Sequence, residues 1–196
     1  WDLATALAGG TGRVQPGDTI WVRSGTYRGS FPVTVSGKSG SPVVIRNYPG
    51  ERAIIDGAGT PGSVSTVHVR GEWTVLWGLE VTNSDPDRTT SSTGHSVRPN
   101  AVVNYASNTR YVNLVVHDAG VAFYNEPEFH NVEVSGCIMY NNGWQGPDRG
   151  HGLALYLKSN TGPLAARDNV VFNQFGYGVG GPIIRNKTFF FALFDI

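Results

Sequence analysis

A dense group of acidic, basic and aromatic side chains lies between His117 and Lys158, and these residue types suit the cutting of sugar chains. Two carboxyl groups beside a glycosidic bond can protonate the leaving oxygen and activate water. A basic group beside a uronic acid can instead remove the proton next to the carboxylate. The residues predicted to be catalytic are Asp118, Glu126, Asp148, His151, Tyr156 and Lys158, and those predicted to bind substrate are His117, Tyr124, Trp144 and Arg149.

Hydrolysis is the first reaction that fits these residues. In a glycoside hydrolase, the carboxylate pair would come from Asp118, Glu126 and Asp148. The chain has 15 Lys and Arg residues against 15 Asp and Glu residues, so its formal net charge is +0. A polyanionic polymer would favour a basic groove. The charge balance therefore favours a neutral polysaccharide and a glycoside hydrolase, with a polysaccharide lyase as the alternative.

Elimination on a uronate polymer is that alternative. One residue would take the proton beside the carboxylate, while a cationic side chain or Ca²⁺ neutralises the carboxylate. The five His residues and the acids show no metal-ligand spacing, so the sequence itself predicts no metal site. Calcium is expected only if the protein is a lyase. The candidate bases are Lys158, Arg149, His151 and Tyr156.

A non-catalytic sugar-binding or surface protein is a third possibility. Aromatic faces offer apolar area to the ring hydrogens of a pyranose, and Trp73, Trp77 and Trp144 are candidates for such stacking. Trp77 directly precedes a predicted strand, and packing at a corner of the fold explains it equally well. Retained binding without turnover would identify this class.

Four segments of the chain share one pattern, an alternating apolar strand that runs into an Asn or Asp. The alternation predicts strands with one face in a narrow core, and the repetition predicts a solenoid. An Asn at a turn tolerates the left-handed backbone conformation, and its amide can bond to the same position one rung away. Asp118 is thus also explained as a turn residue. Stacked segments would align Leu79, Leu114, Cys137 and Asn169; Val81, Val116, Met139 and Val171; and the turn residues Asn83, Asp118, Asn141 and Asn173.

The remaining sequence fits a single all-β domain. The 26 Gly and 11 Pro residues suit a chain that turns often, and residues 1–10 predict a short helix that covers the first coil. Residues 84–100 are polar and predict a loop beside a binding groove. The lone Cys137 falls in the inward column and predicts a small core residue, so no disulfide is expected.

Composition also bears on partners and location. The neutral charge balance gives no global field for nucleic acid or an anionic membrane. No apolar run reaches the length of a transmembrane helix, and many Asn, Thr, Ser and Tyr residues accompany few charges. We therefore expect a secreted protein, extracellular or periplasmic, with a polysaccharide as its partner.

Several motifs carry a resemblance to a known family. Gln15 to Val22, Ser24 to Tyr27, Ile55 to Gly57 and Trp77 to Leu79 look like the right-handed parallel β-helix proteins of the pectate-lyase-like superfamily. The resemblance covers about residues 10–178, and it implies a right-handed parallel β-helix with a short N-terminal capping helix. The superfamily includes lyases, hydrolases, esterases and non-catalytic proteins, so the resemblance implies the fold more sharply than the activity. Asn141 to Trp144, Gly150 to Gly152, Tyr156 and Asn169 to Gly178 are similar to one bacterial branch of it.

The last residues have a different character. Gly180 to Phe191 resembles a segment of TonB-dependent outer-membrane receptors, in which a Gly-Gly-Pro-Ile turn leads into an aromatic strand. So short a segment cannot form a barrel. We expect a β-helix domain over residues 1–178 and, over 179–196, an apolar tail that caps the last coil or mediates a homodimer.

Overall fold

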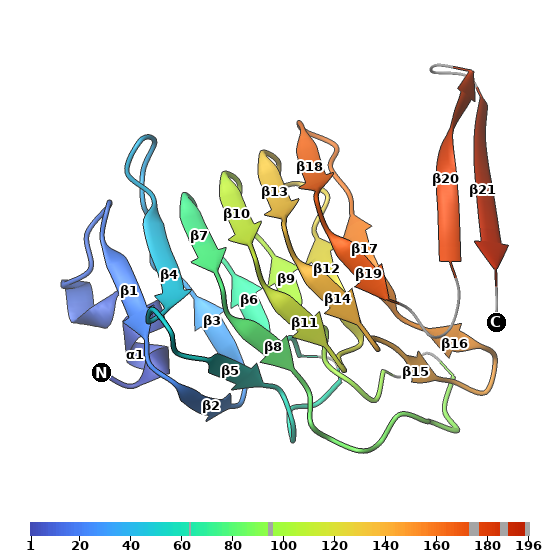
Figure 1. Cartoon of the computed structure of the whole chain (residues 1–196), viewed down its shortest axis with the longest axis horizontal. Helices are drawn as coiled ribbons and strands as arrows, with labels where there is room; N and C mark the ends of the chain where they lie inside the picture. The colour runs from blue at the N-terminus through green and yellow to red at the C-terminus, as the bar shows by residue number, and fades with distance from the viewer. Residues whose placement is uncertain (63, 94–95, 173–176, 185–187, 195–196) are drawn as a thin grey trace.

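The chain folds into a parallel β-helix (Figure 1). The computed structural model describes all residues except 63, 94–95, 173–176, 185–187 and 195–196, and it describes side chains as far as Phe172. In the described part, each coil contributes one strand to each of three parallel sheets, and the chain makes five complete coils and two strands of a sixth. This confirms the fold predicted from the sequence.

The three sheets are named A, B and C in the order in which a coil passes through them. Sheet A contains β1 (Thr19–Val22), β4 (Val43–Asn47), β7 (Thr74–Trp77), β10 (Thr109–Val112), β13 (Val132–Ser135) and β18 (Leu164–Arg167). Sheet B contains β2 (Gly25–Arg28), β5 (Ala53–Asp56), β8 (Glu80–Thr82), β11 (Val115–His117), β14 (Ile138–Tyr140) and β19 (Val170–Phe172). Sheet C contains β3 (Phe31–Val33), β6 (Val67–Val69), β9 (Val102–Asn104), β12 (Val121–Asn125) and β17 (Leu153–Leu157).

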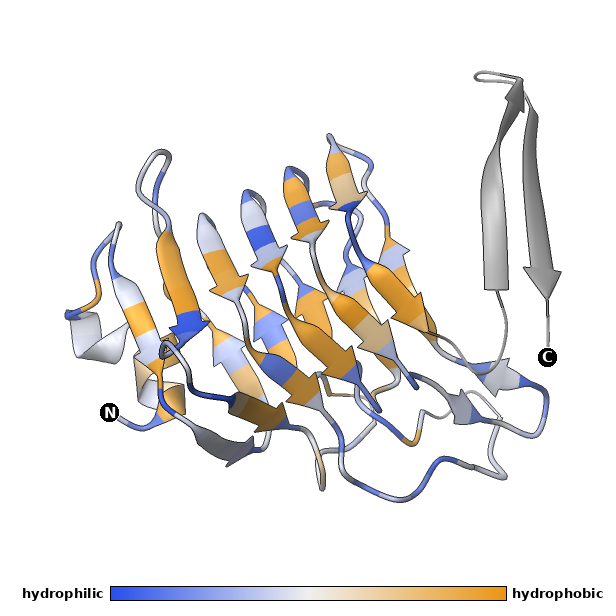
Figure 2. Ribbon diagram, in the orientation of Figure 1, coloured by the Kyte–Doolittle hydropathy of each residue, from blue (hydrophilic) through white to orange (hydrophobic). Residues whose placement is uncertain are grey.

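The predicted columns of apolar residues form the core. Val116 pairs with Val81 on one side and with Met139 on the other, and all three side chains are fully buried. Figure 2 shows hydrophobic residues recurring along the strands of all three sheets. In the last coil, Val171 pairs with Met139 but is 43% exposed. The stacking of the repeats is therefore confirmed, and burial falls where the described coils end.

The N-terminal helix is shorter than predicted but lies where expected. Helix α1 (Leu3–Leu7) begins at Asp2, whose side chain accepts a hydrogen bond from the Thr5 N–H, and a short 3₁₀ turn, η1 (Gly10–Gly12), follows. Leu3 and Leu7 are buried, and the Leu7 carbonyl accepts hydrogen bonds from the chain that follows β3. The helix therefore covers the apolar end of the first coil.

Residues with a left-handed backbone conformation occur both before and after the sheet B strands. The sequence predicted them only in the turn that follows each strand. Asp118 and Asn141 have φ values of 58° and 52°, as predicted, whereas Asn83 is not left-handed and Asn173 lies outside the described residues. The preceding turn between sheets A and B was not predicted to be left-handed. It is so in four successive coils, at Gly78, Asn113, Gly136 and Asp168.

The tail forms strands β20 (Tyr177–Ile184) and β21 (Thr188–Phe194), which pair with each other in antiparallel fashion. This hairpin begins two residues before the boundary expected at residue 179. Its role as a cap or a dimer contact stays a prediction. No helix among the described residues is long and apolar enough to cross a membrane.

Candidate active site

A polar groove of about 630 Å³ opens where the sheet B strands end. One side is the outer face of β2, β5, β8 and β11, and the other is the loop that follows β8, here called the wall loop (residues 84–93 and 96–98). The predicted loop beside a groove therefore lies where the sequence placed it. The lining residues are Thr26, Arg28, Ile54, Asp56, Glu80, Thr82, Asn83, Ser84, Asp85, Pro86, Arg88, Arg98, His117, Asp118 and Asn141.

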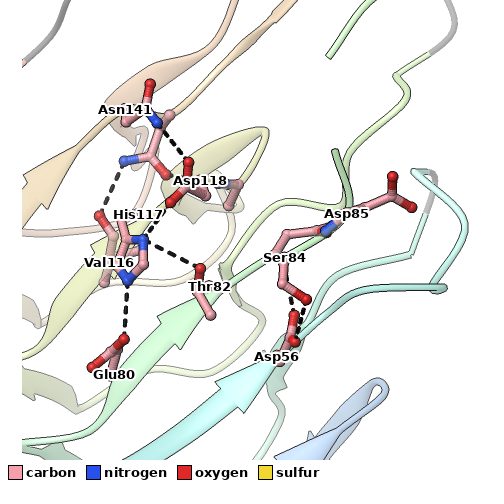
Figure 3. A network of polar contacts seen from close by, with 12 residues as sticks. Asp56, Glu80, Thr82, Ser84, Asp85, Val116, His117, Asp118 and Asn141 are labelled. Atoms are coloured by element: carbon pink, nitrogen blue, oxygen red, sulfur yellow. Dashed lines mark hydrogen bonds and ion pairs between the residues drawn. The ribbon is translucent and has the colours of Figure 1, made fainter. Parts of the chain in front are cut away.

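His117 lies between two carboxylates on the groove floor (Figure 3). Its Nδ1 is 2.6 Å from Asp118 Oδ2, and its Nε2 is 3.1 Å from Glu80 Oε1. The ring also stacks on Tyr140, with centroids 4.6 Å apart and planes 5° apart. Ionised carboxylates only accept hydrogen bonds, so each of these contacts needs a proton on the ring nitrogen that faces the carboxylate. Both ring nitrogens of His117 are thus directed at protein groups rather than at the open groove.

Asp118 is held from three directions. Its Oδ1 accepts hydrogen bonds from Arg88 and, at 2.6 Å, from Asn141 Nδ2, while Oδ2 faces His117. The contact with Asn141 confirms the predicted bond between turn residues of neighbouring coils. Because Arg88 belongs to the wall loop, Asp118 links that loop to two coils of the helix.

Two other groove carboxyls are kept ionised. Burial of Glu80 favours its neutral form, but hydrogen bonds from Arg52 and His117 outweigh this and lower the pKa of Glu80. Burial acts in the same sense on Asp56, where the hydroxyl and N–H of Ser84 donate at 2.6 and 2.9 Å and lower the pKa of Asp56. Neither carboxyl is poised to donate a proton near neutral pH.

Arg98 holds the wall loop in place. Its side chain is almost fully buried, and it donates to the carbonyl oxygens of Asn83, Asp85 and Asp118. These carbonyls belong to the end of one coil, the wall loop and the turn of the next coil. The wall loop reaches further, because the N–H of Gln145 donates to the Arg88 carbonyl at 2.7 Å.

A second cluster lies on the outer face of sheet C and contains four of the predicted site residues. Tyr124 and Tyr156 are register partners on β12 and β17, and their ring centroids are 5.1 Å apart. Lys158 Nζ lies 5.1 Å from the centroid of Tyr124 and 4.8 Å from that of Tyr156. A hydrogen bond to Tyr124 is the main cause that raises the pKa of Lys158, and the charges of Tyr124, Tyr156 and Glu126 act in the same direction. Lysine and tyrosine groups thus meet on an exposed surface.

The remaining predicted site residues lie in a two-stranded hairpin, β15 (Trp144–Gln145) and β16 (Gly150–His151). The rings of Trp144 and His151 stack with centroids 4.0 Å apart. His151 Nε2 is 3.0 Å from Asp148 Oδ1, a hydrogen bond that lowers the pKa of Asp148, and Arg149 Nε is 3.8 Å from Asp148 Oδ2. The hairpin contacts the wall loop through Gln145 but does not line the groove.

The predicted site residues therefore fall into three groups rather than one. His117 and Asp118 lie in the groove, four residues lie on sheet C and four lie in the hairpin. The catalytic pair was expected to come from Asp118, Glu126 and Asp148, but each of these carboxyls belongs to a different group. Three arginines and two acids of the groove were missed, although Glu80 lies in one of the four repeated segments and Asp56 lies in the Ile55 to Gly57 motif. The missed residues are Arg28, Asp56, Glu80, Arg88 and Arg98.

Calcium is the one metal ion expected from the sequence, and only for a lyase. No group of three His, Cys, Asp or Glu residues in the described part of the chain could hold a metal ion. The groove carboxylates instead bond to arginines, a histidine and a serine. The groove carboxylates are therefore already engaged by groups of the protein itself.

Comparisons with known proteins agree on the fold. No protein-family model matches the chain. Over 49 residues it is 45% identical to pectate lyase PEL9 of Emericella nidulans, which covers 24% of this chain and 12% of that protein. A rhamnogalacturonan lyase structure matches 86% of this chain and 45% of its own length, with a TM-score of 0.58 and 18% identity.

Two further structures cover different chemistries. Pectate lyase Pel9A matches with a TM-score of 0.57 and 20% identity, over 86% of this chain and 40% of Pel9A. A GH136 lacto-N-biosidase from Eubacterium ramulus matches with a TM-score of 0.53 and 17% identity, over 81% of this chain and 36% of that one. The chain thus spans under half the length of each.

The chain has the parallel β-helix fold of the pectate lyase and rhamnogalacturonan lyase structures that it matches. The three parallel sheets, the apolar columns and these matches all agree with that fold. The structural matches fall below 25% identity, so they define the fold and not the reaction. None of the comparisons supports the receptor resemblance of the tail.

Proposed function

We propose that this protein is a polysaccharide lyase that cleaves a uronate-containing polysaccharide by β-elimination. The observation that carries the proposal is the cluster of Tyr124, Tyr156 and Lys158 on the outer face of sheet C. Elimination needs a base beside the sugar ring and a cation for the sugar carboxylate, and this cluster offers both. The pectate lyase relative and the lyases of the same fold support this choice.

Lys158 is suited to bind the sugar carboxylate. Its pKa is raised, first by the hydrogen bond to Tyr124, so it stays an ammonium ion over the whole physiological range. An ammonium ion beside the carboxylate stabilises the negative charge that develops there when the neighbouring proton leaves.

Tyr156 is suited to be the base. It is 41% exposed, whereas Tyr124 is already bonded to Lys158. As a phenolate, Tyr156 takes the proton from the carbon beside the carboxylate, the electron pair of that bond forms a carbon–carbon double bond, and the glycosidic carbon–oxygen bond breaks. The phenol then returns the proton to the leaving oxygen, which balances the reaction without a water molecule.

Hydrolysis, which the charge balance of the sequence favoured, has less support. A hydrolase needs one carboxylic acid with a raised pKa. Glu80, Asp56 and Asp148 all have lowered pKa values, and no two of the three carboxyls that were candidates for the pair lie in the same group. The lacto-N-biosidase of the same fold keeps hydrolysis as the second candidate.

Two substitutions test the proposal on purified protein. Tyr156→Phe should lower the rate of unsaturated product formation from a uronate polymer by roughly 10²–10⁴-fold, the usual loss for a proton-transfer residue. Lys158→Met should lower it by roughly 10²–10³-fold, the usual loss when a group that stabilises developing charge is removed. Lys38→Met, on an exposed residue elsewhere, is the control and should keep the full rate. An unchanged rate in Tyr156→Phe would exclude Tyr156 as the base.

A further inference from the structure

Three large aromatic side chains are exposed on or beside the N-terminal part of sheet A. Trp21 is the second-to-last residue of β1 and is 46% exposed. Trp77 is the last residue of β7 and is 36% exposed, and Tyr48 directly follows β4 and is 44% exposed. Figure 1 shows β1, β4 and β7 side by side. Three exposed aromatic rings on consecutive coils form a surface that packing of the core does not explain.

Arg46 lies inside this surface. It pairs in register with Trp21 on one side and with Trp77 on the other. The guanidinium carbon is 5.2 Å from the centroid of Trp21 and 4.3 Å from that of Trp77. The guanidinium is therefore held between two indoles, one on the coil below and one on the coil above.

Arg46 lacks the acidic partner that other arginines of the chain have. Arg23 pairs with Glu51, and Arg110 pairs with Glu133. Among the described residues, Arg46 makes no ion pair, and its buried Nε has no hydrogen-bond partner. A cation that stacks on aromatic rings but has no acid beside it is a ready binding partner for an external anion.

The geometry indicates which anion fits. Both indoles lie within cation–π distance of the guanidinium. The Nε of Arg46 is buried, but its two terminal nitrogens are not among the buried unpaired atoms and make no hydrogen bond to a described residue, so they stay available to a ligand. A planar guanidinium binds a carboxylate with two parallel hydrogen bonds. Because Trp21 and Trp77 lie two rungs apart, about 10 Å at the usual strand spacing, the surface has room for more than one sugar ring around the carboxylate.

We propose that Arg46, with Trp21 and Trp77, is a binding site for the carboxylate of a uronic acid unit in a polysaccharide. The site lies on sheet A, whereas Tyr156 and Lys158 lie on sheet C, so it binds the polymer without taking part in its cleavage. The nature of the polymer rests on the proposed lyase function. The binding itself needs only an unpaired guanidinium and a carboxylate.

Binding can be measured without turnover. The Tyr156→Phe protein is titrated with a short oligogalacturonate while tryptophan fluorescence is followed, since two indoles flank the site. Arg46→Met in that background should weaken binding roughly tenfold to a hundredfold, the range for hydrogen bonds to a charged group. Arg46→Lys should be intermediate, because it keeps the charge and loses the two-pronged contact. Arg110→Met is the matched control on the same sheet and should bind normally.

Further measurements separate the possible outcomes. A neutral oligosaccharide of equal length should not bind, and added salt should weaken oligogalacturonate binding. Equal binding by Arg46→Met, or equal binding of the neutral sugar, would overturn the proposal. If binding depends on Arg46 but the wild-type protein never forms unsaturated product, this binding site is upheld and the lyase function is refuted. If Arg46→Met proves unstable, the Arg46→Lys titration decides.

Discussion

Replacing Arg98 by methionine removes a buried cation from the base of the wall loop. The side chain is 1% exposed and donates to three carbonyl oxygens, at 2.9 Å to Asn83 and 2.5 Å to Asp118, with the third on Asp85. Methionine fills similar space but donates nothing. Leaving a buried acceptor unsatisfied costs about 1–3 kcal/mol. Since some of the three carbonyls regain water, we expect a loss of about 3 kcal/mol, or roughly 6–12 °C in Tm for a chain of this size.

Urea unfolding followed by far-ultraviolet circular dichroism measures this loss. Arg110→Met is the control, because Arg110 has a 66% exposed side chain and a 3.7 Å ion pair with Glu133. Such an exposed pair contributes about 0–1 kcal/mol. If Arg98→Met and Arg110→Met lose the same small amount, the buried guanidinium does not hold the wall loop, and the account of the groove fails.

Three further predictions concern single residues. The lowered pKa of Glu80 means that its ion pair stabilises the fold above the ordinary glutamate pKa of 4.5 and less as the pH falls below it, so Glu80→Gln should lose stability at pH 7 and differ little from wild type in acid. An equal difference at both pH values would contradict this. Asn141→Leu should lose about 2–3 kcal/mol in thermal or urea unfolding, because leucine resists the left-handed backbone and the bond to Asp118 disappears. Asn141→Asp would be less strained, and a neutral effect of leucine would count against the turn assignment. Burial raises the pKa of the Cys137 thiol to about 11, so native protein should react with a thiol reagent far more slowly than urea-unfolded protein, and equal rates would refute the burial.

The fold was readable from the sequence because a coil repeats one constraint many times. Val81, Val116 and Met139 recur at equivalent positions, and side chains that alternate along a strand can bury only one face. The left-handed turn before sheet B was less visible. Its residues are Gly in two coils and Asn or Asp in the others, and these are the residue types that accept a positive φ by different means.

The candidate site was only partly readable, because nearness in sequence does not give nearness in space here. His117 and Tyr124 are seven positions apart, yet one lies on sheet B and the other on sheet C. Glu126 and Lys158 are far apart in sequence, but neighbouring coils bring them together on sheet C. Tyr124, Tyr156 and Lys158 were each named as candidates, while their meeting depends on the register of β12 and β17.

The residues that hold the groove were missed for a different reason. Arg88 and Arg98 lie in the wall loop, whose sequence has no periodicity that could relate it to the strands. Their partners are Asp118 and backbone carbonyls, and a backbone carbonyl leaves no trace in a sequence. Only the folded loop shows that these two arginines are structural cations of the groove.

The most direct test of the central claim is mass spectrometry of the products formed from a uronate oligosaccharide in water enriched in heavy oxygen. Elimination breaks the glycosidic bond without adding water. We therefore expect an unsaturated fragment, and we expect that cleavage itself adds no heavy oxygen to the new chain ends. The Tyr156→Phe protein should form that fragment far more slowly. Saturated fragments that carry one heavy oxygen for each bond cut would instead mean hydrolysis, and the assignment of Tyr156 and Lys158 to elimination would be wrong.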